Sequence, residues 1–236
     1  MLFPQLDLDI LFDIMSGIVA LLVSYYSFRY TRLIENSVLK FISLGFIMLG
    51  IGLLVEACVF SLVVFNVGDL TTVRIFALGT AALYYILQMG AYFLFAVGYL
   101  RSALAGSKVK IEAAGTVAAG FLLPIINSPG GNRVRAMFHL TRTIFVVTEI
   151  FSVVFLAVVV FVGLLSYSET RHRFSLLVLA SFVLILAAQA FELWTAISIS
   201  VRLDFVSSAV QFAGFLSLLI FLLWRNKIGP ARKTAQ

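Results

Sequence analysis

Seven runs of apolar residues, each long enough to cross a lipid bilayer, dominate this chain of 236 residues. About 20 helical residues, at a rise of about 1.5 Å each, cross the roughly 30 Å of hydrocarbon in a bilayer. The runs cover approximately residues 10–28, 39–65, 75–100, 111–126, 137–165, 174–199 and 204–224. Only 12% of the residues are charged, against about 25% in soluble domains. The sequence predicts an all-α integral membrane protein with seven transmembrane helices, a single membrane domain over residues 1–236, located as a multi-pass protein in the cell membrane.

The lysines and arginines predict how the chain is oriented in the bilayer. Twelve of the 17 fall in the polar segments on one side of the seven runs, and five fall on the other side. Because cytoplasmic loops carry the excess of Lys and Arg, the richer side is expected to be cytosolic. We therefore expect the N-terminus outside and the C-terminus in the cytosol, with residues 226–236 forming a basic cytosolic tail.

Two of the apolar runs each contain one glutamate in an equivalent place. Residues 42–58 (ISLGFIMLGIGLLVEAC) and 178–194 (VLASFVLILAAQAFELW) match at an offset of 136, which aligns Glu56 with Glu192. A carboxylate inside a transmembrane segment is costly and by default marks a functional site with a partner. Gly45 lies on the same helical face as Glu56, and small residues favour close helix contacts in lipid. The glutamates are therefore expected to face the interior of the bundle.

The match between the two halves of the chain extends to neighbouring runs. Asp13 aligns with Glu149 at the same offset of 136, and Gln88 aligns with Gln211 at an offset of 123. Three spans, a linking span and three further spans in the same orientation form a parallel repeat about an axis along the membrane normal. The sequence predicts a first repeat at 8–101, a linker helix at 111–127 and a second repeat at 137–225. Chance similarity between apolar helices is the alternative.

The rare polar residues of the spans are expected to gather in the outer half of the bundle. Four carboxylates in a medium of low dielectric constant cannot all stay ionised unless they are protonated, paired with Arg142, or bound to a cation. Oxygen ligands suit hard cations, so a bound cation would be held by Glu56, Glu149 and Glu192. Alternatively, these residues form interhelical hydrogen bonds worth about 0.6 kcal/mol each. The candidate ligand- or ion-binding residues are Asp13, Glu56, Gln88, Arg142, Glu149, Gln189, Glu192 and Gln211.

Several kinds of chemistry are disfavoured by the residues present. Seven spans resemble the layout of microbial rhodopsins, but residues 205–224 contain no lysine for a retinal Schiff base. His139 and His172 lie near opposite membrane faces, so no haem pair or catalytic triad is expected, and Cys58 is the single cysteine. No cluster of basic residues is interleaved with exposed aromatic residues, as a nucleic-acid partner would require. We expect no enzyme activity and no cofactor other than a bound cation.

Three functions fit this pattern. The first is a small transporter or channel-like protein, whose carboxylate-lined site takes a proton or a small cationic solute. The second is a seven-helix sensor or binding module that signals to a membrane or cytosolic protein partner through residues 171–173 and the basic tail. The third is a structural subunit of a larger membrane complex. The three-plus-one-plus-three order is similar to that of sugar transporters of the SWEET class, although the runs at 10–28 and 137–165 lack that class's proline.

Overall fold

Six long helices make up the part of the chain that the computed structural model describes, residues 3–34, 37–64, 70–103, 133–171, 173–198 and 201–228. The predicted linker helix at 111–127 and most of the predicted tail at 226–236 lie outside the described residues. The helices are α1 (Phe3–Ile34), α2 (Ser37–Val64), α3 (Leu70–Ala103), α5 (Arg133–Thr170), α6 (Arg173–Ser198) and α7 (Val201–Ile228).

Each of these helices contains a span that can cross a membrane, which confirms the prediction of an all-helical, multi-pass membrane protein. The spans are 20 to 25 residues long, enough for the hydrocarbon of a bilayer. Three of them, in α1, α3 and α5, end later than the apolar runs in the sequence, because these helices continue beyond the runs. The spans are Ile10–Thr31, Val38–Leu62, Gly79–Ala103, Phe145–Ser168, Ser175–Thr195 and Phe205–Trp224.

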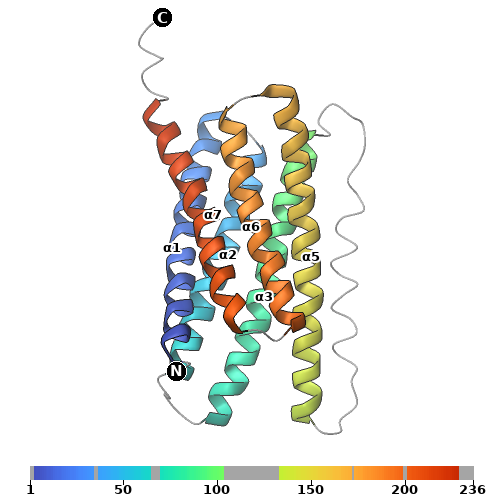
Figure 1. Ribbon diagram of the computed structural model, residues 1–236. Coiled ribbons are helices and arrows are strands. Elements are labelled where there is room, and N and C mark those ends of the chain that lie inside the picture. The colour runs from blue at the N-terminus through green and yellow to red at the C-terminus, as the bar shows by residue number, and fades with distance from the viewer. Residues whose placement is uncertain are drawn as a thin grey trace, which may run out of the picture.

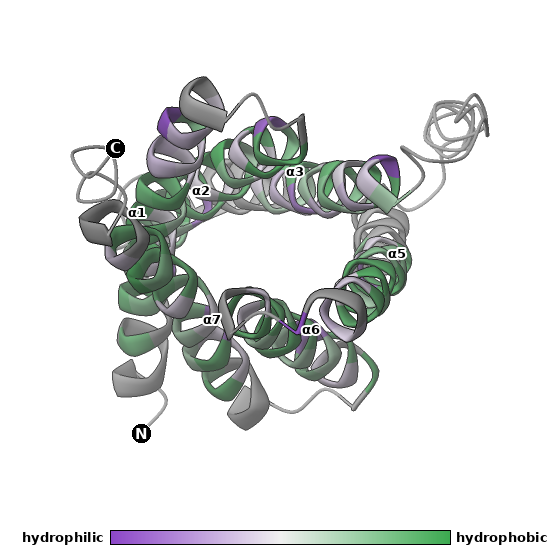
Figure 2. Cartoon of the chain, turned by 90° about the horizontal axis from the view of Figure 1, so that it is seen from above, coloured by the Kyte–Doolittle hydropathy of each residue, from purple (hydrophilic) through white to green (hydrophobic). Residues whose placement is uncertain are grey.

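The helices form a closed ring in the order α1, α2, α3, α5, α6, α7, with α7 returning to α1. Figure 2 shows this ring from above. We call α1, α2 and α3 the first group of three and α5, α6 and α7 the second, and Figure 1 shows that neighbouring helices within each group run in opposite directions. One end of the ring therefore collects the last turns of α1, α3, α5 and α7, and we name it the cavity end. The opposite end, where α2 and α6 finish, is named the polar end.

The surface of the ring is apolar and its interior contains polar groups, which is the reverse of a soluble protein. Large apolar side chains on the outer faces are well exposed, among them Tyr25 at 60%, Phe161 at 61% and Trp194 at 62%. In contrast, Glu149 and Gln88 are completely buried. Such an extensive apolar surface fits contact with lipid.

Small residues let adjacent helices approach closely within each group of three. Gly45 of α2 lies against α3, where an added Cβ would stand 3.0 Å from the Ala91 carbonyl oxygen. Gly214 of α7 lies against α6, where an added Cβ would stand 3.2 Å from the Ser181 carbonyl oxygen. These contacts bring the helix backbones close enough for the short polar side chains near them to reach across.

A tight turn at Arg171 joins α5 to α6. Its φ of 45° is in the left-handed region, which ends the helix at Thr170. The Arg171 amide donates a hydrogen bond of 2.8 Å to the Tyr167 carbonyl oxygen and so satisfies one of the last carbonyls of α5. The turn returns the chain directly into α6 as the antiparallel neighbour of α5.

Candidate functional site

A hydrogen-bond network centred on Glu192 links three helices inside the polar end of the ring. Gln88 of α3 donates from Nε2 to Gln189 Oε1 of α6 at 2.8 Å and to Glu192 Oε2 at 3.3 Å. Gln189 Nε2 donates to the same Glu192 Oε2 at 2.8 Å. The single hydroxyl proton of Ser207 of α7 is shared between the Ala188 carbonyl oxygen at 2.9 Å and Glu192 Oε1 at 3.1 Å. Both carboxylate oxygens of Glu192 thus receive hydrogen bonds.

Three further carboxylates, from Asp13, Glu56 and Glu149, lie close to Glu192 or to one another. Glu56 of α2, which is 9% exposed, interacts with both Asp13 of α1 and Glu192. Glu149 of α5 interacts with both Glu192 and Glu56. Four acidic side chains from four helices therefore share one interior region, in which Glu56 and Glu149 are buried and Asp13 and Glu192 are half-buried. Like charges repel strongly where little water screens them.

Glu149 is the most strongly buried of these acids, and its environment differs from that of Glu192. It is 0% exposed, and neither of its carboxylate oxygens has a hydrogen-bond partner among the described residues. An ionised carboxylate buried without a partner is very costly. Within the described part of the chain, nothing therefore compensates a negative charge on Glu149.

Further buried polar atoms on α1, α3, α5 and α7 lack hydrogen-bond partners in the described part of the chain. Tyr92 lies near both Gln88 and Gln211, yet its hydroxyl forms no hydrogen bond of standard geometry with them. A buried polar atom without a partner costs about 1–3 kcal/mol and calls for an explanation, such as water or a ligand. The atoms are Ser16 Oγ, Gln88 Oε1, Tyr92 Oη, Ser152 Oγ and Gln211 Nε2, in addition to the two oxygens of Glu149.

None of the basic side chains that the structure describes lies where it could neutralise this cluster. Arg29, Lys40, Arg101 and Arg171 are exposed and belong to the helix ends at the cavity end. The side chain of Arg142, which the sequence pairs with Glu149, lies outside the described side chains. Within the described residues, no three His, Cys, Asp or Glu side chains are grouped so that they would hold one metal ion. A metal bound by Glu56, Glu149 and Glu192 stays a prediction.

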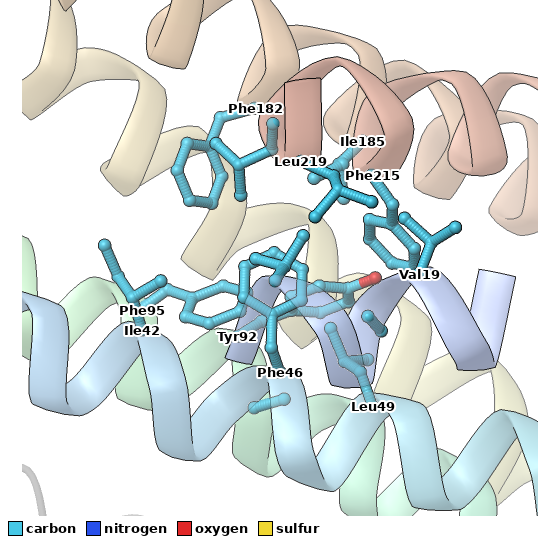
Figure 3. Close-up of a cluster of buried hydrophobic side chains, with 14 of the residues drawn as sticks. Val19, Ile42, Phe46, Leu49, Tyr92, Phe95, Phe182, Ile185, Phe215 and Leu219 are labelled. Atoms are coloured by element: carbon cyan, nitrogen blue, oxygen red, sulfur yellow. The ribbon is translucent and has the colours of Figure 1, made fainter. Parts of the chain in front are cut away.

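A layer of aromatic side chains separates the polar cluster from the cavity end. Phe46 and Phe95 of the first three helices pack with ring centroids 4.9 Å apart. Each also contacts a ring from the second three: Phe46 lies 5.5 Å from Phe215, and Phe95 lies 5.6 Å from Phe182. Figure 3 shows these side chains, together with Tyr92, pointing toward one another across the ring. All of these rings are almost fully buried, so the layer excludes water from the axis of the ring.

Beyond the aromatic layer, a cavity of about 600 Å³ opens toward the cavity end of the ring. All six described helices contribute to its walls, so it lies on the axis of the ring and not between a helix pair and the lipid. Phe182 belongs to both the aromatic layer and the cavity lining, and Tyr99 packs on it edge to face at 5.6 Å. Polar cluster, aromatic layer and cavity are thus stacked along one axis.

The structure brings together all the predicted site residues whose side chains it describes. Asp13, Glu56, Gln88, Glu149, Gln189, Glu192 and Gln211 line the same interior region, whereas Arg142 is not among the described side chains. Their binding of a ligand or ion stays a prediction. Sequence reasoning missed Ser207, although its position one helical turn before Gln211 places it on the same face. The cavity was also missed, because its walls come from six separate helices.

The two aligned glutamates are not chemically equivalent. Glu192 receives hydrogen bonds from Gln189 and Ser207. The positions that align with these donors in the first half are Leu53 and Tyr84. The aligned positions therefore carry different side chains around each glutamate, and the hydrogen bonds to Glu192 come from Gln189 and Ser207 of the second half and from Gln88 of the first half.

Comparison of the chain with protein-family models, with curated proteins and with solved structures gave no match.

Proposed function

We propose that this protein is a small membrane carrier that moves a solute across the bilayer by using a proton or cation bound at its carboxylate cluster. The observation that carries the proposal is the stacking of three zones along one axis. A buried polar cluster at one end and a cavity at the other are separated by a single layer of aromatic rings. A carrier needs such a barrier between two compartments that open alternately.

The charge of the cluster supports a proton or a monovalent cation as the driving ion. Glu149 is completely buried without a partner in the described residues, and Glu56 and Glu192 add negative charge nearby. Uptake of one positive charge relieves the repulsion between the carboxylates and the cost of burying Glu149. A proton needs no ring of ligands, so it suits a cluster whose described acids are not grouped around one metal position.

The proposed repeat of three plus three helices gives the carrier its moving parts. Gly45 aligns with Ser181 and Ala91 aligns with Gly214, and each aligned pair lies at a close approach between neighbouring helices. Aligned interior residues are also similarly buried: Phe46 and Phe182 at 0% and 1%, Gln88 and Gln211 at 0% and 2%. Rocking of one group of three helices against the other would open the aromatic layer, because its rings come from both groups.

The remaining predictions about the protein belong to the same proposal. The linker helix at 111–127 would let both groups of three cross the membrane in the same direction. The distribution of Lys and Arg places the cavity end in the cytosol and the polar end outside. No catalytic step, cofactor or nucleic-acid partner enters the mechanism.

Reconstitution into sealed liposomes tests the carrier function. The liposomes contain the fluorescent pH indicator pyranine, and the membrane potential is clamped with potassium and valinomycin. A pH step outside should produce a proton flux that depends on the protein, and uptake of radiolabelled methylammonium measures in parallel whether a monovalent cation can take the place of the proton at the carboxylates. Replacing Glu149 with Gln, or Glu56 and Glu192 together with Gln, should lower the flux to that of protein-free liposomes.

A matched control separates the cluster from acidic residues in general. Glu169 is in the last turn of α5 and outside the membrane span, so Glu169→Gln should keep the wild-type flux. Circular dichroism and size-exclusion profiles check that every variant is folded. Unchanged flux in Glu149→Gln and in the double variant would overturn the carrier proposal. Ligand binding without flux, together with co-purification of a partner protein, would instead favour the sensor.

A further inference from the structure

The cavity at the cavity end is a site separate from the carboxylate cluster, and its walls have a different chemistry. None of the described residues that line it is charged. Five lining residues carry hydroxyl groups, and most of the others are apolar. The hydroxyl-bearing residues are Tyr30, Tyr99, Ser102, Ser166 and Ser175.

Polar and apolar residues occupy different depths of this cavity. Ser102 is in the last turn of α3 and Ser175 in the first turn of α6, so both lie at the mouth. The floor is formed by Phe182, which is 1% exposed, and by Leu179, which is 7% exposed. The cavity therefore offers an apolar floor and a rim of hydroxyl groups.

A volume of about 600 Å³ lies within the range of about 300–1,000 Å³ that is common for small-molecule sites. A cationic ligand would lose water on entry without meeting an opposite charge on the walls, which is unfavourable, and the described charges at this end of the ring, Arg29, Lys40, Arg101 and Arg171, are all positive. An apolar chain placed against Phe182 and Leu179 gains burial from water. A hydroxyl or carbonyl group at the mouth can exchange hydrogen bonds with the serines there.

We propose that the cavity binds an uncharged amphipathic molecule, with its apolar part on the floor at Phe182 and its hydroxyl or carbonyl group at the rim. The claim that this molecule is the solute that the protein carries rests on the carrier function proposed above. The binding site itself rests only on the lining of the cavity. Proton and solute then occupy opposite sides of the aromatic layer, so they do not compete for one position.

Photolabelling with a diazirine derivative of octanol tests the site in the full-length protein in lipid nanodiscs. Peptide mass spectrometry locates the adducts, and competition with unlabelled octanol separates saturable binding from partition into lipid. We expect saturable adducts at cavity residues such as Tyr99. Octanol should displace them, whereas octylammonium, which has a similar chain and a positive charge, should not.

Substitutions at the mouth provide a second readout. Ser175→Trp fills the rim and should reduce the saturable labelling by about tenfold or more, equivalent to about 1.4 kcal/mol of binding free energy. Leu164→Trp introduces the same side chain on α5 at a residue that is 49% exposed and does not line the cavity. It should label like the wild type.

The outcomes separate this inference from the carrier function. Adducts confined to outward-facing residues such as Tyr25 and Trp194, or displacement by octylammonium as efficient as by octanol, would overturn the proposed site. Glu149→Gln should lose the proton flux and keep the labelling. If the wild type shows saturable labelling but no flux of any kind, the binding site stands and its role in carrying a solute is rejected.

Discussion

Gln88 of α3 donates a hydrogen bond of 2.8 Å to Gln189 of α6, although these two helices are not neighbours in the ring. The bond therefore crosses the interior and connects the first group of three helices to the second. Gln189 in turn orients Glu192 through a bond of 2.8 Å. Rearrangement of the two groups would have to change this contact, which makes it a sensitive point for experiment.

The Gln88–Gln189 contact should contribute a measurable coupling energy. Gln88→Leu removes a donor from both Gln189 and Glu192 and should lower the free energy of unfolding by about 1 kcal/mol. A double-mutant cycle with Gln189→Leu should give a coupling of about 0.6 kcal/mol, and at most about 1.7 kcal/mol. Unfolding in bicelles measures these values. Gln211→Leu is the control, because Gln211 Nε2 has no partner in the described residues; a cost equal to that of Gln88→Leu would contradict the role of the contact.

Replacing two of the glutamates with leucine should change stability in opposite directions. Glu149→Leu removes a buried carboxyl group without a described partner and should raise stability by about 1–3 kcal/mol. Glu192→Leu removes the acceptor of Gln189 Nε2 and one of the two acceptors of Gln88 and of Ser207, and should lower stability by a similar amount. Each kcal/mol corresponds to roughly 2–4 °C in Tm for a chain of this size. Thermal unfolding in detergent checks both, and shifts of the same sign would refute the difference in environment.

Gly45 should not tolerate even a methyl group. The added Cβ of Gly45→Ala would collide with the Phe95 ring and stand 3.0 Å from the Ala91 carbonyl oxygen, so α2 and α3 would have to separate. We expect a loss of about 1–3 kcal/mol. Gly79→Ala is the matched control on α3, because nothing lies within 4 Å of its added Cβ. It should be neutral or stabilising by up to about 1 kcal/mol. Equal losses in the two variants, measured by thermal unfolding, would count against close packing at Gly45.

Cysteine labelling should detect the aromatic layer as a barrier. In a Cys58→Ser background, Ser175→Cys places a thiol at the cavity and Ser152→Cys places one beyond the layer, where Ser152 is 1% exposed. A membrane-impermeant maleimide applied from the cavity side should modify Ser175→Cys rapidly and Ser152→Cys slowly, because Phe46, Phe95, Phe182 and Phe215 lie between them. Mass spectrometry follows both reactions. Equal rates from that side would show that the layer does not close the path.

The sequence predicted the spans well because their signal is local. A helix that crosses a bilayer must be apolar over about 20 residues wherever it lies in the fold, and six such spans are present in the described residues. The polar candidates were also identifiable from the sequence, because Glu149 or Gln88 in an apolar helix is conspicuous. The ends of the helices were less predictable, because α3 and α5 extend into polar residues that the apolar runs do not include.

The pairing of these candidates was not predictable from the sequence. Helical periodicity assigns Gln88 and Gln189 to inward faces, but it does not specify which helices face each other across the ring. The sequence alignment made Gln88 of α3 equivalent to Gln211 of α7. In the structure, however, Gln88 donates its hydrogen bond to Gln189 of α6. Ser207 was overlooked because serine is common in membrane helices and gains its importance only from its distance to Glu192.

The length of the apolar runs and the few polar residues within them were therefore enough to predict that this chain spans the membrane as helices and keeps acidic side chains in its interior. Only the tertiary structure decided that both carboxylate oxygens of Glu192 accept hydrogen bonds while Glu149 is buried without a described partner, and that a cavity whose described lining is uncharged lies across an aromatic layer from both. The physical reason is that burial and periodicity act along one helix, whereas hydrogen bonds, like-charge repulsion and cavities depend on how separate helices pack around a common axis.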